Sequence, residues 1–181
     1  MSRIGRAPIS VPAGVTVDVN TENEVIVTGP KGSLRQWVDP TCIKVAVENG
    51  HVVLSRNSDE NQIKAKHGLY RALIANMVKG VVEGYSKSVT ISGIGYKCAV
   101  QGNKIVLNIG YSHPVNIEIP RGLTATCPSA TEIVISGIDK TAVGQFAADI
   151  KALKKVEPYH GYGIYYTNEP VRRKEIKKGK K

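Results

Sequence analysis

The sequence predicts an α+β fold made of two tandem related modules, each an antiparallel β-sheet packed with one main α-helix, and an extended basic C-terminal arm. Two observations predict the modules: apolar residues first alternate with a period of two and then recur every three to four residues, and this order occurs twice. A third predicts the arm, because no apolar period continues beyond residue 155. We therefore expect modules at residues 1–82 and 83–155 and an arm at residues 156–181.

The first module is expected to open with short strands at residues 15–19 and 24–28, where apolar residues alternate with polar ones or form a short buried run. Residues 29–32, Gly-Pro-Lys-Gly, place glycine and proline where a tight turn needs positive or fixed φ. Asn49-Gly50, between two further apolar runs, is a strong β-hairpin signal. The chain should therefore fold back on itself as an antiparallel sheet.

An amphipathic helix is expected from residue 61 onward. Its apolar positions are separated by three to four residues or multiples of this spacing: Ile63, Tyr70, Ile74, Met77 and Val81. Ser58 or Asp59 is the expected N-terminal cap, and Gly84 is the expected stop. One helix should therefore close the first sheet.

The second module repeats this plan. Strands are expected at residues 88–92, 97–100, 104–109, 115–119 and 132–136. The helix that follows has its apolar face at Val143, Phe146, Ala147, Ile150 and Leu153, with Asp139 or Thr141 as its cap. Residues 24–29 (Glu-Val-Ile-Val-Thr-Gly) correspond type for type to residues 132–137 (Glu-Ile-Val-Ile-Ser-Gly), which indicates duplication of one sheet-plus-helix unit.

The net charge of +10 is concentrated at the two ends of the chain. Residues 1–6 carry +2 and residues 171–181 carry +6, whereas residues 7–170 hold 16 basic and 14 acidic side chains. A near-neutral body with basic ends is typical of a protein whose ends bind phosphate groups.

The three cysteines, Cys42, Cys98 and Cys127, are odd in number, far apart and set in apolar stretches. We expect them to be buried free thiols in a reducing compartment, not disulfides. The first residues have no apolar run of the kind that makes a signal peptide, and the sequence has no stretch of about 18 apolar residues that would span a membrane. The sequence therefore predicts a soluble intracellular protein without a membrane partner.

Catalytic and metal-binding chemistry is not indicated. None of the four histidines has a cysteine at a metal-ligand spacing, so no catalytic residue, metal or cofactor is predicted. The Gly-x-Gly segments at residues 93–95 and 161–163 lack the other residues of a nucleotide-binding loop, and the first more simply marks a bulge or bend between strands. An enzyme built on a Cys–His or Ser–His pair that forms only in space is the least favoured alternative.

The arm combines tyrosine and glycine with lysine and arginine. Charged side chains suit phosphates, tyrosine rings stack on unpaired bases, and glycine permits close approach. RNA is favoured over duplex DNA because no helix is basic along one face, whereas irregular RNA offers shape and splayed bases. Two alternatives stay open: residues 178–181 are a merely solvated tail, and some of the tyrosines dock back on the second module.

Several sequence blocks, in order along nearly the whole chain, are shared with one known family. They are Met1-Ser-Arg-Ile-Gly, Pro12-Ala-Gly-Val, Thr28-Gly-Pro-Lys-Gly, Arg71-Ala-Leu-Ile-Ala-Asn-Met-Val, Gly93-Ile-Gly-Tyr-Lys, Gly110-Tyr-Ser-His-Pro-Val, Gly137-Ile-Asp-Lys, and Glu157-Pro-Tyr with Gly161-Tyr-Gly-Ile. The chain closely resembles the family of the bacterial-type sixth protein of the large ribosomal subunit.

The resemblance implies two tandem modules of related fold, in agreement with the internal repeat. It also implies a structural and assembly protein, not an enzyme, that binds large-subunit rRNA chiefly through the second module and the C-terminal arm. The implied location is near the base of the stalk where translation factors dock, close to the sarcin-ricin region. There it would be a monomer beside neighbouring ribosomal proteins. The implied compartment is the cytoplasm or an organelle of bacterial descent.

The predicted rRNA-binding residues lie mainly in the arm. The first group is Tyr159, Gly161, Gly163, Arg172, Arg173 and Lys174. The remaining candidates are His160, Tyr162, Tyr165, Lys177, Lys178, Lys154, Lys155, Arg3, Lys97, Ser112 and His113.

The arm departs from the family pattern at three positions. Basic residues commonly stand in the family where His160, Tyr162 and Tyr165 stand here. We hypothesise that Tyr162 or Tyr165 stacks on a base or ribose in place of an ion pair. The main rival from another class is a protein-docking module whose basic tail is idle.

Overall fold

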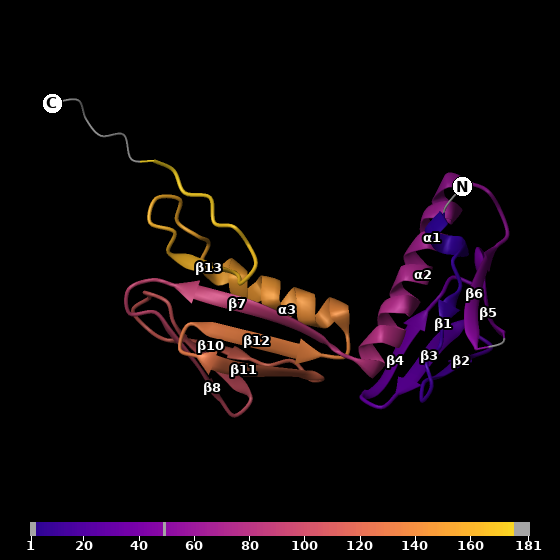
Figure 1. Ribbon diagram of the computed structural model, residues 1–181, viewed down its shortest axis with the longest axis horizontal. Coiled ribbons are helices and arrows are strands. Elements are labelled where there is room, and N and C mark those ends of the chain that lie inside the picture. The colour runs from indigo at the N-terminus through magenta and orange to yellow at the C-terminus, as the bar shows by residue number, and fades with distance from the viewer. Residues whose placement is uncertain (1–2, 49, 176–181) are drawn as a thin grey trace. The chain divides into compact units, whose positions relative to one another are not determined.

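The structure, a computed structural model, describes residues 3–48 and 50–175. The chain forms two compact units, Met1–Gly84 with Ile138–Lys140 and Tyr85–Gly137 with Thr141–Lys181. In Figure 1, helix α2 runs along the strands of the first unit and helix α3 along those of the second. The predicted fold class, two tandem sheet-plus-helix modules, is confirmed.

The first unit contains two antiparallel sheets and two helices. In chain order its elements are α1 (Arg3–Arg6), β1 (Ile9–Ser10), β2 (Thr16–Val19), β3 (Glu24–Gly29), β4 (Gly32–Trp37), β5 (Ile43–Glu48), β6 (His51–Arg56) and α2 (Asn61–Val82). The strand orders are β2-β3-β4 and β1-β6-β5. Val25 and Val27 of β3 are fully buried and pack in one core with Ile74 and Val81 of α2.

The predicted turn at residues 29–32 joins β3 to β4 and also holds the end of α2. A Cβ on Gly29 would lie 2.7 Å from Val81 Cγ2, so only glycine lets the hairpin approach the helix this closely. The Lys31 N–H donates to the Val81 carbonyl at 3.1 Å, which satisfies one of the carbonyls left free at a helix end.

The ends of α2 fit the sequence prediction only at the C-terminus. Gly84 has φ of +79° directly after the C-cap, which is the left-handed stop that the sequence predicts. At the other end the N-cap is Glu60, and its side chain makes no capping bond. The prediction of Ser58 or Asp59 as cap is wrong, because Asp59 instead pairs with the Arg56 guanidinium.

The second unit has a four-stranded and a three-stranded sheet around one core. In chain order its elements are β7 (Tyr85–Ser92), β8 (Lys97–Gln101), β9 (Lys104–Asn108), β10 (Val115–Glu118), β11 (Leu123–Ser129), β12 (Glu132–Gly137), α3 (Lys140–Leu153) and β13 (Gly163–Tyr166). The strand orders are β11-β12-β7-β13 and β10-β9-β8, and all neighbouring strands pair antiparallel. Phe146 and Ile150 of α3 lie in the same core as Ile133 and Ile135 of β12.

The internal repeat is visible in the packing of β3 and β12. Each is flanked by a strand on both sides, and each buries its second and fourth residues completely. Each also ends in a glycine against a neighbouring side chain, since a Cβ on Gly137 would lie 2.6 Å from Leu123 Cδ2 and 3.0 Å from Val143 Cγ2. The matching sequence blocks therefore have matching structural positions.

Candidate nucleic-acid interface

The segment after α3 folds back onto the second unit. Strand β13 pairs antiparallel with β7 in the register Ile164↔Ile91 and Tyr166↔Val89, at the edge of the four-stranded sheet. Ile164 is fully buried in the core, and Tyr166 packs against that core. The alternative that some of the tyrosines dock back on the second module is therefore correct for Tyr166. The sequence does not predict the strand itself. Two apolar positions are too few to show a period in the sequence.

Glu157 organises the turn before β13. Its carboxylate accepts hydrogen bonds from the backbone N–H groups of Tyr159 (3.0 Å) and His160 (2.6 Å) and lies 3.2 Å from His160 Nδ1. The Gly161 N–H donates to the Glu157 carbonyl (3.0 Å), and the Glu157 N–H donates to the Tyr162 carbonyl (2.8 Å). The amide donors, His160 first, lower the pKa of Glu157 below its ordinary value because they stabilise the charged carboxylate.

Gly161 provides the surface on which the Arg173 side chain rests. Gly161 is buried with φ of +77°, and a Cβ there would lie 2.7 Å from Arg173 Nε and 3.1 Å from its Cζ. The backbone beside Arg173 is tied to the turn, because the Lys174 N–H donates to the Pro158 carbonyl at 2.8 Å. Glycine at 161 is thus required both for positive φ and for the contact, which orients the guanidinium of an exposed residue.

Gly163 allows two backbone segments to touch. It has φ of +147°, and a Cβ there would lie 2.6 Å from Val156 Cα and 2.8 Å from the Lys155 carbonyl oxygen. The next residue, Ile164, donates its N–H to the Lys154 carbonyl at 2.9 Å. Gly161 and Gly163 are both buried, so they build the loop, while the side chains that face solvent belong to their neighbours.

The exposed rings of the turn are those of Tyr159 and Tyr162, whose exposed fractions are 49% and 37%. The rings of His160 and Tyr162 are stacked, with centroids 5.5 Å apart and planes 14° apart. Tyr165 is half-buried on β13. An exposed, already stacked pair of rings suits further stacking on an unpaired base.

A charge cluster fixes the chain after β13. Lys151 of α3 pairs with both carboxylate oxygens of Glu169, at 2.5 Å and 2.8 Å, and the same carboxylate accepts the Tyr166 N–H at 3.2 Å. Lys87 and Lys151 place their ammonium groups 4.4 Å and 4.5 Å from the centre of the Tyr166 ring. The hydrogen bond from Lys151 is the main reason why the pKa of Glu169 lies below its ordinary value. We call residues 157–174, which these contacts hold to the second unit, the arm loop.

Other predicted residues lie at the start of a strand, in a loop and just after α3 in the same unit. Lys97 is exposed at the start of β8, and Ser112 and His113 are exposed in the loop between β9 and β10, with Ser112 Oγ 3.4 Å from His113 Nδ1. Lys154 is half-buried, with its ammonium 4.8 Å from the centre of the Tyr111 ring. The Tyr111 hydroxyl donates to the Leu153 carbonyl at 2.8 Å, which joins this loop to the end of α3.

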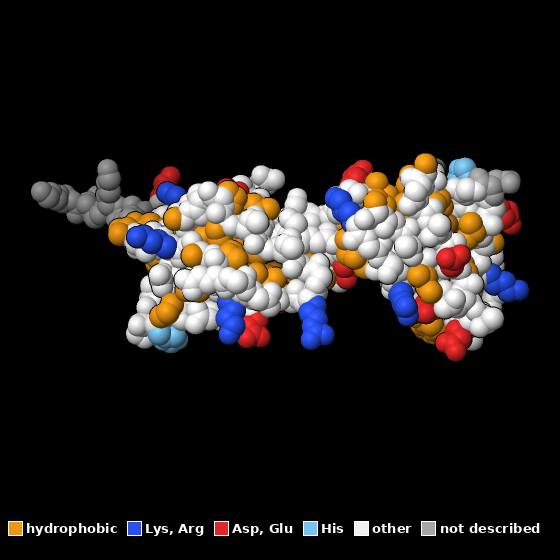
Figure 2. All heavy atoms as spheres, turned by 90° about the horizontal axis from the view of Figure 1, so that it is seen from below, with side chains coloured by type: hydrophobic (Ala, Val, Ile, Leu, Met, Phe, Trp, Pro, Cys, Tyr) orange, Lys and Arg blue, Asp and Glu red, His pale blue; other side chains and the backbone are white. Residues whose placement is uncertain are grey.

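The structure brings together the arm-loop residues but not all of the predicted set. Lys155 is exposed beside the crossing at Gly163. Arg3 belongs to α1 of the first unit, a different body from the one that carries the others. Lys177 and Lys178 lie outside the described residues. On the face seen in Figure 2, basic side chains are scattered over both units with acidic ones among them, as expected for a near-neutral body.

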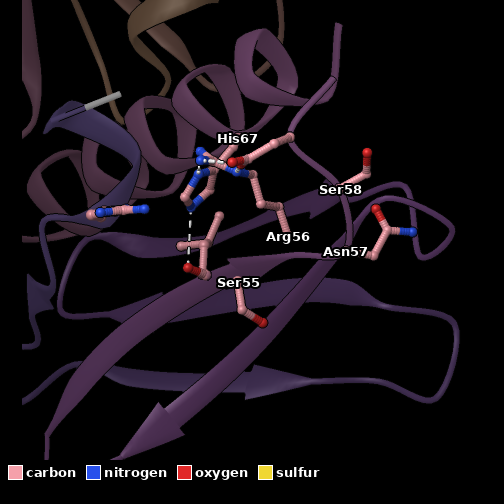
Figure 3. A pocket seen from close by; sticks show the side chains of 8 residues that line it. Ser55, Arg56, Asn57, Ser58 and His67 are labelled. Atoms are coloured by element: carbon pink, nitrogen blue, oxygen red, sulfur yellow. Dashed lines mark hydrogen bonds and ion pairs between the residues drawn. The ribbon is translucent and has the colours of Figure 1, made fainter. Parts of the chain in front are cut away.

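A cavity of about 400 Å³ in the first unit resembles an anion site at first sight, because Arg6 and Arg56 both line it (Figure 3). The Arg56 guanidinium is already engaged, with the Asp59 carboxylate at 2.6 Å and with His67 Nδ1 at 3.3 Å. Since arginine only donates, His67 Nδ1 is the acceptor and its Nε2–H donates to the Leu54 carbonyl at 3.1 Å. Buried His67 is thus a satisfied core residue, and the cavity supports no separate anion site.

The three cysteines are free thiols. Cys98 is buried, as predicted, whereas Cys42 and Cys127 are half-buried, so the prediction of burial is wrong for these two. Burial is the main reason why the pKa of Cys98 is raised to about 12, and the neighbouring Cys127 raises it further. The Cys98 thiol is therefore a poor nucleophile near neutral pH. Within residues 3–48 and 50–175 no three His, Cys, Asp or Glu side chains form a cluster that could hold a metal ion. Among the same residues no helix is long and apolar enough to cross a membrane.

Comparison with known families finds a match over most of the chain. The family model described as Ribosomal protein L6 matches residues 11–84 and 92–167, one stretch in each unit. The chain belongs to the ribosomal protein L6 family. The resemblance that the sequence blocks indicated is thereby confirmed.

Bacterial members of the L6 family are similar over their whole length. The protein named Large ribosomal subunit protein uL6 of Clostridium kluyveri is 54% identical over 181 residues, 100% of both chains. The protein of that name from Clostridium botulinum strain Eklund 17B is 52% identical over 100% of both chains, and that of Caldicellulosiruptor bescii is 51% identical over 99% of this chain and 98% of its own. The L6 match ends at residue 167, so it includes the glycine turn and β13, whereas Arg172 and Arg173 lie beyond it.

Sequence reasoning missed the acidic residues that organise the arm loop. Glu157 and Glu169 both accept hydrogen bonds from backbone N–H groups two or three residues away in the chain. A Glu-Pro pair at the start of a Gly-rich turn is a weak signal for such a role, because carboxylates next to turns accept amide bonds. The Lys151–Glu169 pair spans 18 residues and has no signal in the sequence.

Proposed function

We propose that this chain is a structural constituent of the large ribosomal subunit and binds large-subunit rRNA through its second unit and the arm loop. Membership of the L6 family supports the proposal, as do relatives named for the large subunit with about half of their residues identical. The observation that carries the RNA contact is the Arg173 guanidinium packed on Gly161, in the turn that also carries the exposed side chains of Tyr159 and Tyr162.

The electrostatics of the arm loop favour a polyanion. Its two acidic residues are engaged within the protein: the Glu157 carboxylate accepts backbone N–H hydrogen bonds, and the Glu169 carboxylate pairs with the Lys151 ammonium. The exposed basic side chains of Arg172, Arg173 and Lys174 remain for a partner. Planar guanidinium groups suit bidentate phosphate contacts, and tyrosine rings suit base stacking.

A second set of contacts would extend the interface. Lys97, Ser112, His113, Lys154 and Lys155 supply charge and hydroxyl or imidazole donors from neighbouring loops of the second unit. We propose that Lys177 and Lys178 continue the arm beyond the described residues and that Arg3 contributes from the first unit.

The proposed location follows from the family resemblance. We place the protein on cytoplasmic ribosomes, as one copy per large subunit, near the base of the factor-binding stalk and the sarcin-ricin region, beside other large-subunit proteins. Its proposed role is to stabilise rRNA structure for translation, without a catalytic step.

Binding of purified full-length protein to a large-subunit rRNA transcript, measured over a range of salt concentrations, tests the proposal. The variant Arg172→Ala, Arg173→Ala, Lys174→Ala removes three exposed charges without touching β13. The matched control Arg35→Ala, Lys44→Ala, Lys64→Ala removes the same charge from the first unit. Each lost phosphate contact should lower the slope of log K against log salt by about 0.7–0.9.

The arm-loop variant should bind more weakly and show a slope reduced by about 2–3, whereas the control should resemble the unmodified protein. Equal affinities and slopes for the two variants would contradict an interface at the arm loop. Failure of the unmodified protein to bind any large-subunit transcript would contradict the proposed function itself.

A further inference from the structure

Ile94 has the highest exposed fraction, 85%, of the large hydrophobic side chains that the structure describes. It lies in the bend between β7 and β8, away from the core of the second unit. Leaving a whole isoleucine side chain in water forgoes the stabilisation that its burial would give. Packing within the described chain therefore does not explain this residue.

The bend that carries Ile94 is held in one shape. The Tyr96 N–H donates to the Gly93 carbonyl at 3.2 Å, and Gly95 has φ of +75°, the pattern of a type II turn with Ile94 at its first central position. The Tyr96 ring packs against the turn, since a Cβ on Gly93 would lie 2.5 Å from Tyr96 Cδ2. The same ring contacts Gly110, where a Cβ would lie 3.0 Å from Tyr96 Cε1. The turn that exposes Ile94 is thus supported by the ring of Tyr96.

This support joins three segments into one surface. Gly110 leads into Tyr111, whose hydroxyl donates to the Leu153 carbonyl at 2.8 Å and whose ring lies 4.8 Å from the Lys154 ammonium. The bend with Ile94, the loop with Ser112 and His113, and the C-terminal end of α3 are therefore neighbours through Tyr96 and Tyr111. We call residues 93–97, 110–113 and 153–155 together the apical surface.

The charge around the apical surface indicates the kind of partner. The sequence has no Asp or Glu in residues 85–97, 108–117 or 151–156, whereas Lys97, Lys154 and Lys155 are all there. Ile94 is flanked in the sequence by two glycines, and the other exposed large hydrophobic side chain of the apical surface is Tyr111, 48% exposed, which carries a hydroxyl. One aliphatic tip amid cations and hydroxyls matches RNA, whose shallow minor groove offers apolar ribose faces between 2′-hydroxyls and phosphates.

We propose that Ile94 is an apolar wedge that packs on ribose faces in an RNA minor groove, while Lys97 meets a flanking phosphate and Ser112 and His113 reach 2′-hydroxyls. The inference rests on the proposed function and adds a shape-reading contact to it. Because Ile94 carries no charge, its contribution is independent of counterion release, which distinguishes it from the arm-loop cations.

The test compares Ile94→Ser with Leu69→Ser in binding of full-length protein to the large-subunit rRNA transcript. Leu69 is a matched control, an aliphatic residue of α2 in the first unit that is 54% exposed. Ile94→Ser should lower affinity about tenfold at every salt concentration, the ratio expected when burial of one large aliphatic side chain is lost, and leave the salt slope unchanged. Ile94→Met should restore most of the affinity, and Lys97→Ala should lower the slope by about 0.7–0.9.

Probing of 2′-hydroxyl reactivity locates the contact. Ile94→Ser should expose a group of nucleotides that stays protected in Arg173→Ala. Ile94→Ser could leave the rRNA affinity and the nucleotide protection unchanged while Arg173→Ala weakens binding. That result would contradict the proposal that Ile94 is a wedge and would leave the proposed function standing. If Ile94→Ser binds rRNA normally yet is lost from assembled subunits, the tip meets a protein and the wedge is likewise overturned. If the unmodified protein does not bind the rRNA transcript, the proposed function itself is contradicted.

Discussion

The Arg173 guanidinium packs directly on Gly161, twelve residues earlier in the chain, so closely that a Cβ at 161 would lie 2.7 Å from Arg173 Nε. This contact joins the basic end of the arm loop to the turn that carries the exposed side chains of Tyr159 and Tyr162. A basic tail and a tyrosine-rich turn thereby become one surface. The contact needs glycine, because Gly161 also has φ of +77°.

Replacing Gly161 with alanine should weaken both the fold and RNA binding. The left-handed φ alone costs a residue with a Cβ about 1–2 kcal/mol, and the clash with Arg173 adds to this. Gly102→Ala is the matched control, since Gly102 has φ of +59° with nothing within 4 Å of an added Cβ. Hydrogen exchange of the second unit should show a loss in both variants, and rRNA affinity should fall only for Gly161→Ala. Equal affinities would mean that the Arg173 position is immaterial.

Ile164→Ala should destabilise the second unit by about 2–5 kcal/mol, because it removes a fully buried side chain from the core. Ile94→Ala, at a side chain that is 85% exposed, should change stability little. Denaturant unfolding, monitored by hydrogen exchange of β7 and β12, measures the change in stability of both variants. A loss below about 0.5 kcal/mol for Ile164→Ala would mean that β13 is not part of the folded unit. Truncation after residue 156 deletes this strand, so charge-removal variants are cleaner probes of the arm loop.

The turn before β13 should be less stable in acid, because protonation of the Glu157 carboxylate removes the stability that it contributes. The folded-state pKa is lowered by the amide donors of His160 and Tyr159. A carboxyl with a lowered folded pKa contributes stability that is present above its unfolded pKa and is lost as pH falls through the folded pKa. The stability difference between the unmodified protein and Glu157→Gln should therefore be largest near neutral pH and shrink below about pH 4. A difference that is constant from neutral pH to about pH 3 would contradict the lowered pKa.

Tyr162→Lys combined with Tyr165→Arg should make rRNA binding more dependent on salt. If stacking replaces ion pairs at these positions, two added cations should raise the slope by up to about 1.4–1.8. Tyr162 is the better placed of the two, because its ring is exposed and stacked on His160, whereas Tyr165 is half-buried. Comparing salt titrations of the double variant and of Tyr162→Lys alone separates the two positions. An unchanged slope in both would count against substitution of stacking for charge.

Strong local signals explain why much of the fold was predictable. The period of α2, the stop at Gly84 and the turn at residues 29–32 depend on neighbours in sequence and are all present. Strand β11 was missed because Pro128 weighs against a strand, and the structure accommodates it with a register shift between Thr126 and Ser129.

The candidate site was less predictable because its decisive contacts join distant residues. The composition of the arm predicted tyrosine, glycine and basic residues as an interface, but not which of them face outward. Gly161 and Gly163 are buried where the chain crosses itself, and the contact of Gly161 with Arg173 exists only once β13 has docked. Spatial crossings of this kind leave no periodic pattern for sequence analysis to detect.

The most direct test of the central claim is sedimentation of tagged full-length protein from a cell lysate, at low and at high salt, beside the Arg172→Ala, Arg173→Ala, Lys174→Ala variant and the matched first-unit control. We expect the unmodified protein and the control to travel with the large subunit, whereas the arm-loop variant should move towards the light fractions, more so at high salt. If all three forms stayed in the light fractions at both salts, or if all three sedimented alike with the large subunit, an arm-loop contact with rRNA would be contradicted.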